Sequence, residues 1–89
     1  KLEESLKYYD RLSAENLNAH DQINKGHLAF CMGKKKEAAT CYKLGLESGK
    51  ISIDDFMRIF NDDKALLIKN GVDPDDIPIL LDYLFYILE

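Results

Sequence analysis

The sequence predicts an all-α protein of five or six helices. Apolar side chains recur every three or four residues through most of the 89-residue chain, which places them on one face of successive helices. Short polar or glycine-containing segments separate these stretches, as expected for helices that fold back on their neighbours. Hydrophobic residues make up 46% of the chain and charged residues 31%, which is ordinary for a folded protein and argues against disorder.

The first predicted helix spans residues 2–14 and has one apolar stripe opposite a charged face, which is typical of a helix with one buried side. The stripe consists of Leu2, Leu6, Tyr9 and Leu12. Residues 15–18 follow as a connector, in which Asn16 and Asn18 serve as turn and capping residues. The next helix is therefore expected to begin near residue 18.

Two antiparallel helices are predicted in the central stretch, at about residues 18–32 and 35–47. Gly33 follows the last periodic residue of the first, where a residue without Cβ can adopt the left-handed conformation that ends a helix. Ser48 and Gly49 mark the end of the second. The connection between them is so short that the helices must pack side by side.

Gly26 lies inside the first of these helices, where glycine costs roughly 1 kcal/mol relative to alanine. A close approach of the two helices would explain it. We therefore expect Gly26 and Ala38 to lie where the backbones come nearest, with Tyr42 covering the space beside Ala29.

A further helical region is predicted at residues 53–69. Ser52 followed three residues later by Asp55 has the pattern of a capping box, with acidic groups in the first turn. Polar residues at 61–63 interrupt the apolar face, which leaves open one helix or two pieces broken near Asn61. Asp62 is suited to cap a second piece, so two pieces are slightly favoured.

The last predicted helix, residues 78–88, follows an acidic turn and is apolar almost all round, with Asp82 as its single charge. It is too short to span a bilayer, which needs ~20 residues. Its apolar surface must be covered by the preceding helices or shared with a dimer or another domain. The residues predicted for self-association are Leu81, Leu84, Phe85 and Leu88.

The central stretch resembles the tetratricopeptide repeat, a 34-residue pair of helices with small and aromatic residues at fixed positions. The residues that carry the resemblance are Gly26, Ala29, Gly33, Glu37, Ala38 and Tyr42. The sequence departs from the family pattern at Gln22, Lys25, Ala29, Gly45 and Lys50, where the family has tryptophan, leucine, tyrosine, alanine and proline.

This resemblance implies a right-handed stack of antiparallel helices in a single domain. Residues 1–18 would be the second helix of a preceding repeat, with Ser5 and Tyr9 as its small and aromatic residues, and residues 19–50 the complete repeat. Residues 51–89 would be a divergent C-terminal cap. We expect the natural protein to continue upstream, because half a repeat leaves an apolar face uncovered.

The resemblance also implies a non-catalytic protein–protein interaction module, since the first helices of such repeats line a groove that takes partner peptides. The predicted groove residues are His20, Ile23, Asn24, His27, Phe30 and Cys31. Imidazole and amide groups would bond an extended backbone while the apolar side chains offer pockets. One alternative is that these residues only pack against neighbouring helices. Another is an assembly element that self-associates through the last helix.

Other classes of function have little support in the sequence. A net charge of −4 argues against nucleic acid or an anionic membrane as the partner. His27 and Cys31 lie one helical turn apart, but two ligands do not make a metal site. We read Cys31 and Cys41 as free thiols in a helical core. We predict no cofactor, no metal and no catalytic residue.

Overall fold

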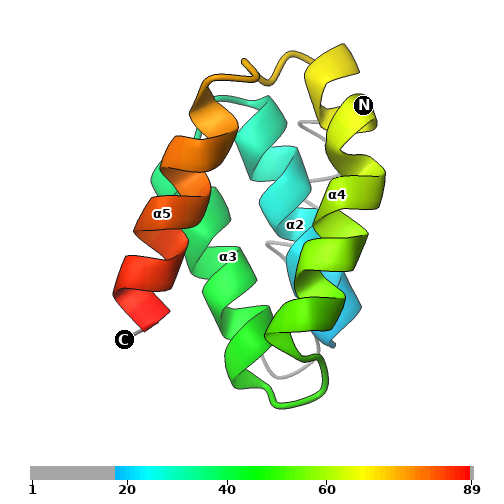
Figure 1. Cartoon of the computed structure of the whole chain (residues 1–89), viewed down its shortest axis with the longest axis vertical. Coiled ribbons are helices and arrows are strands. Elements are labelled where there is room, and N and C mark those ends of the chain that lie inside the picture. Colours follow the sequence, from blue (N-terminus) through cyan, green and yellow to red (C-terminus); the bar gives the residue numbers. More distant parts are fainter. Residues whose placement is uncertain (1–17, 89) are drawn as a thin grey trace.

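The computed structural model describes residues 18–88, which form four α-helices and no strand (Figure 1). The helices are α2 (Ala19–Cys31), α3 (Lys35–Glu47), α4 (Ile53–Lys69) and α5 (Asp76–Leu88). The all-α prediction is confirmed. The predicted number of five or six helices is not matched in this part of the chain, and the helix predicted at residues 2–14 lies outside the described residues.

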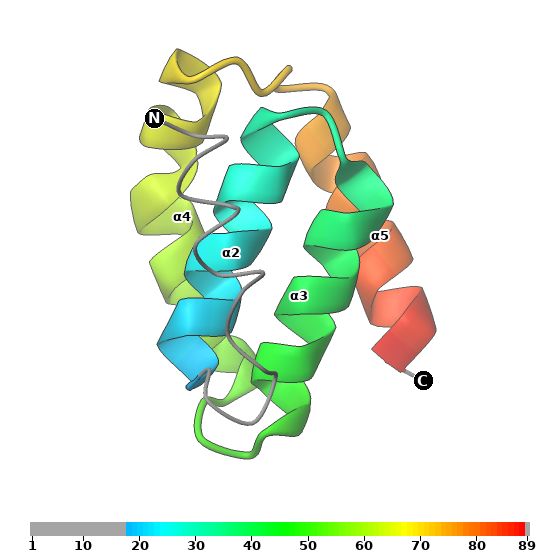
Figure 2. The ribbon, with the colours of Figure 1, turned by 180° about the vertical axis from the view of Figure 1, so that it is seen from behind.

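The α2–α3 hairpin is the centre of the fold, and α4 and α5 flank it. Helices α2 and α3 run antiparallel and pack closely, with α4 beside α2 and α5 beside α3 (Figures 1 and 2). Figure 1 shows that α4 runs in the same direction as α2, and α5 in the same direction as α3. Helices α4 and α5 therefore each run parallel to the helix of the central hairpin that they lie beside.

The ends of α2 are fixed as the sequence predicts. The side chain of Asn18 accepts a hydrogen bond of 2.8 Å from the backbone N–H of Asp21 at the start of the helix. At the other end Gly33 adopts a φ of +79°, and the N–H of Lys34 bonds to the carbonyl of Ala29 at 2.9 Å. The left-handed glycine turns the chain directly into α3.

Helix α4 is continuous from Ile53 to Lys69, so the favoured break near Asn61 is wrong. Phe60 and Leu67 are both buried on the same face, one on either side of the polar segment. Asn61 and Asp62 are exposed on the outer face, where polar side chains do not interrupt the helical hydrogen bonds.

Helix α5 begins at Asp76, two residues before the predicted start at Pro78. Proline is tolerated in the first turn of a helix because its missing N–H has no partner there. An acidic turn precedes the helix, in which the N–H of Asp76 bonds to the carbonyl of Asp73 at 2.9 Å. The prolines thus lie at the start of this helix without ending it.

An aromatic cluster joins α4 to the α2–α3 hairpin. Tyr42 of α3 and Phe56 and Phe60 of α4 are all fully buried, with ring centroids 5.3 to 5.8 Å apart. Such tilted and edge-to-face pairs add to the free energy gained from burial alone. Ile23 of α2 and Leu84 of α5 complete the buried centre.

Gly26 makes a close contact with α3, and the ring of Tyr42 forms that contact. A Cβ at Gly26 would lie 2.5 Å from Cε1 and 2.7 Å from Cδ1 of Tyr42. The atoms nearest to this position therefore belong to the Tyr42 ring and not to Ala38.

Candidate functional site

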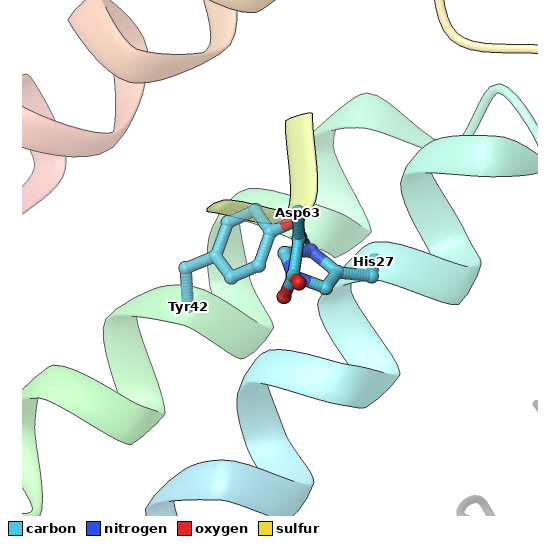
Figure 3. Close-up of polar contacts among 3 residues, drawn as sticks. All are labelled: His27, Tyr42 and Asp63. Atoms are coloured by element: carbon cyan, nitrogen blue, oxygen red, sulfur yellow. Dashed lines mark hydrogen bonds and ion pairs between the residues drawn. The ribbon is translucent and has the colours of Figure 1, made fainter. Parts of the chain in front are cut away.

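A chain of hydrogen bonds connects three helices at the edge of the aromatic cluster (Figure 3). Nδ1 of His27, on α2, lies 2.7 Å from the hydroxyl of Tyr42 on α3. Nε2 of the same ring lies 3.1 Å from Oδ2 of Asp63 on α4. The His27 side chain is 13% exposed and that of Asp63 38% exposed, so the chain of bonds runs from the core to the surface.

The chemistry of the three groups fixes the direction of these bonds. An ionised carboxylate only accepts, so Nε2–H of His27 donates to Asp63, and in the neutral imidazole Nδ1 accepts from the Tyr42 hydroxyl. Burial lowers the pKa of His27 below its ordinary value, against the opposing effect of Asp63. Burial also raises the pKa of Tyr42 well above its ordinary value, so the hydroxyl keeps its proton.

The lowered pKa of His27 makes folding stability depend on pH. The folded state binds a proton at His27 more weakly than the unfolded chain does. The contribution of neutral His27 to folding stability is therefore fully present above pH 6.5 and declines as pH falls from there toward the pKa of His27 in the folded state. We expect the free energy of unfolding by urea to rise with pH in this window for the wild type. In His27→Gln the rise should be smaller.

The exposed His20 offers a matched control, since His20→Gln removes an imidazole from the same helix without touching the buried bonds. This variant should retain the pH dependence of the wild type. An equal pH dependence in His27→Gln would contradict the assignment of the effect to His27.

The structure separates the six predicted groove residues into three groups. His20 and Asn24 are exposed on α2, and His27 and Cys31 are half-buried between α2 and its neighbours. Ile23 and Phe30 belong to the core and are 2% and 3% exposed. Their side chains therefore pack in the core and do not form the predicted apolar pockets on the surface.

The four residues predicted for self-association are placed mostly against the core. Leu84 is fully buried, Leu81 and Leu88 pack against the core cluster, and Phe85 is half-buried. The exposed apolar side chains of α5 are instead Ile79, Tyr83 and Tyr86. A contact made by this helix with another molecule would use these three.

Sequence reasoning missed the pairing of His27 with Tyr42 and Asp63. The signal available was that His27 follows Gly26, the residue expected at the close approach of the two helices. Asp63 was interpreted only as part of a polar interruption, because its position depends on where α4 lies relative to α2. That position follows from tertiary packing and is not visible in local spacing.

Cys31 is half-buried and Cys41 is buried, and the two are not joined by a disulfide. Within residues 18–88 no group of three or more His, Cys, Asp or Glu side chains is placed to hold a metal ion. Among the described helices none is long and apolar enough to cross a membrane. No family model, curated protein or solved structure matches this chain significantly. The functional interpretation therefore depends on the chain's own geometry.

Proposed function

We propose that this chain is a non-catalytic protein–protein interaction module, a tetratricopeptide-like stack whose groove receives a peptide or another domain. The observation that supports it most is the spacing of equivalent helices. Helix α2 begins at Ala19 and α4 at Ile53, 34 residues later, which is the period of this family. The matching directions of the paired helices fit a stack of repeats (Figure 1).

The caps of these two helices repeat with the same period. Asn18 caps α2 through the N–H of Asp21, and Ser52 caps α4 through the N–H of Asp55 at 3.0 Å. Both helices therefore start with the same arrangement of a polar cap and an acidic residue three positions later. Each residue of α2 can therefore be matched to the residue of α4 that lies 34 positions later in the sequence.

The 34-residue offset extends the proposed groove from α2 to α4. His20 and Asn24 correspond to Asp54 and Arg58, and all four side chains are exposed. Imidazole, amide, carboxylate and guanidinium groups supply the donors and acceptors that hold an extended peptide. Arg58 bonds to Asp55 on its own helix at 3.0 Å, but an exposed pair of this kind contributes little and leaves Arg58 available to a ligand.

The geometry of the buried polar chain supports a non-catalytic role. Tyr42, His27 and Asp63 are ordered like a nucleophile, a base and its orienting acid. However, Tyr42 is fully buried beneath α4, so no substrate atom can approach its hydroxyl. We assign to these three residues the role of joining the helices.

The test is a peptide-display selection against the whole chain, followed by calorimetric titration of the selected peptide. Asn24→Ala combined with Arg58→Ala is expected to weaken binding at least about tenfold, since each removes a hydrogen-bonding group from the groove. Lys36→Ala, an exposed change at the corner between α2 and α3, should leave the affinity unchanged. Equal affinity of the groove variant and the wild type would overturn the proposal.

A further inference from the structure

The outer face of α5 carries an apolar stripe that nothing in residues 18–88 covers. Ile79, Tyr83 and Tyr86 are 60%, 40% and 74% exposed. Their spacing of four and then three residues places them on one side of the helix. The opposite side, with Leu80 and Leu84, is buried in the core. Helix α5 is thus apolar on two faces, only one of which is needed for folding.

The exposed charged side chain that α5 itself places beside this stripe is negative. Asp82 is exposed, three residues after Ile79 and four before Tyr86, so it lies beside the stripe. Residues 70–89 contain no lysine or arginine. The last turn of α5 therefore has no basic side chain to offset the negative end of the helix dipole. Lys35, from α3, is already paired with Asp76 at 3.2 Å.

We propose that the outer face of α5, formed by Ile79, Asp82, Tyr83 and Tyr86, docks a basic amphipathic helix of a partner protein. The apolar side of such a helix would cover the stripe, and its lysines or arginines would face Asp82 and the carboxyl end of α5. Exposed tyrosines suit this contact, because the ring gives apolar area and its face attracts a cation.

A second copy of the chain fits this face less well than a basic helix does. If two α5 helices paired antiparallel about the middle of the stripe, between Asp82 and Tyr83, the two Asp82 carboxylates would face each other. Like charges in an interface oppose association. The one-sided charge of the stripe thus selects a partner of opposite charge.

This surface is separate from the groove of the proposed function, which lies on α2 and α4. The inference does not require the groove to bind anything, and the groove does not require α5 to bind. Substitutions at Asn24 and Arg58 test the groove, whereas substitutions at Tyr83 and Tyr86 test the outer face of α5. The failure of either proposal can therefore be recognised without affecting the other.

The experiment is an NMR titration of the ¹⁵N-labelled whole chain with two synthetic helical peptides of about the length of α5. One peptide carries leucines at helical spacing and lysines elsewhere, and the other has glutamate in place of every lysine. We expect the lysine peptide to shift the amide signals around Ile79, Tyr83 and Tyr86. The glutamate peptide should bind far more weakly, and added salt should lower the affinity of the chain for the lysine peptide.

Two variants with a matched control test the residues themselves. Tyr86→Ser and Tyr83→Ser are each expected to lower the affinity for the lysine peptide about tenfold, because an aromatic anchor is lost at the contact. Leu66→Ser removes a side chain on α4 that is 58% exposed, and should change the affinity by no more than about twofold. All three changes lie on the surface, so a circular-dichroism melt should show folded protein.

Three results would overturn the inference. The first is equal binding of the two peptides or no binding at all. The second is a set of shifts that lies away from α5. The third comes from sedimentation of the chain alone: a dimer that Tyr86→Ser converts to a monomer would make a second copy the occupant of this face.

Discussion

Replacing Phe60 with alanine is expected to lower the free energy of unfolding by about 3–5 kcal/mol, the usual cost of removing a buried phenylalanine ring. Phe60 is fully buried, and its ring lies 5.8 Å from the rings of His27, Tyr42 and Phe56. Because a small domain is stabilised by only about 5–15 kcal/mol, this one change removes a large part of the total. Urea denaturation followed by circular dichroism measures the loss.

The control for this variant is Leu66→Ala on the same helix. Leu66 is 58% exposed, so truncating it should alter the free energy of unfolding by less than about 0.5 kcal/mol. Similar costs for the two variants would mean that α4 is not anchored by Phe60. The description of the aromatic cluster as the contact that holds α4 on the α2–α3 hairpin would then fail.

Gly26→Ala is expected to destabilise the protein by about 1–2 kcal/mol, although alanine normally favours a helix by roughly 1 kcal/mol. The new methyl group would lie 2.5 Å from Cε1 of Tyr42, which is too close for any real contact. The ring cannot move aside easily, since Tyr42 is fully buried against Phe56 and Phe60. The cost of overpacking, about 1–3 kcal/mol, therefore outweighs the gain in helix propensity.

Gly45→Ala provides the matched comparison, because it brings the same gain in helix propensity at another buried glycine. The nearest atom to its new Cβ would be the carbonyl oxygen of Ala19 at 3.2 Å, a tight contact but less severe than the 2.5 Å at Gly26. We expect thermal denaturation to show a small change for Gly45→Ala and a clear loss for Gly26→Ala. A stabilised Gly26→Ala protein would contradict the packing of Tyr42 on Gly26.

Much of the fold could be predicted from local signals. The helix starting after Asn18 and the one starting after Ser52 follow from side chains that cap the next turn. The end of α2 follows from Gly33, whose left-handed φ disfavours other residues. In each of these places the determining interaction spans only a few residues of sequence.

The errors arose where tertiary packing decides between local alternatives. Residues 61–63 have the composition of a break, but the burial of Phe60 and Leu67 on one face keeps α4 continuous. In the same way, Leu84 looks available for self-association in a helix that is apolar all round. Only the position of α5 against α3 shows that Leu84 faces the core and that Tyr86 faces outward.

In the candidate site, too, local spacing predicts part of the arrangement and tertiary packing decides the rest. Asn24, predicted as a groove residue, is exposed, as such a residue must be. Ile23 and Phe30 were predicted for the same groove, yet they are buried because neighbouring helices cover their side of α2. Periodicity gives the angular position of a residue on its helix but not the extent of cover by the neighbours.

The central structural claim is that α4 packs onto the α2–α3 hairpin at Tyr42, whose ring contacts Gly26 of α2 and Phe60 of α4. A nuclear Overhauser experiment on the whole chain tests it most directly. The ring protons of Tyr42 should show cross-peaks both to the Hα protons of Gly26 and to the ring protons of Phe60. Cross-peaks to neither residue, in a spectrum where the Tyr42 ring is assigned, would contradict the account.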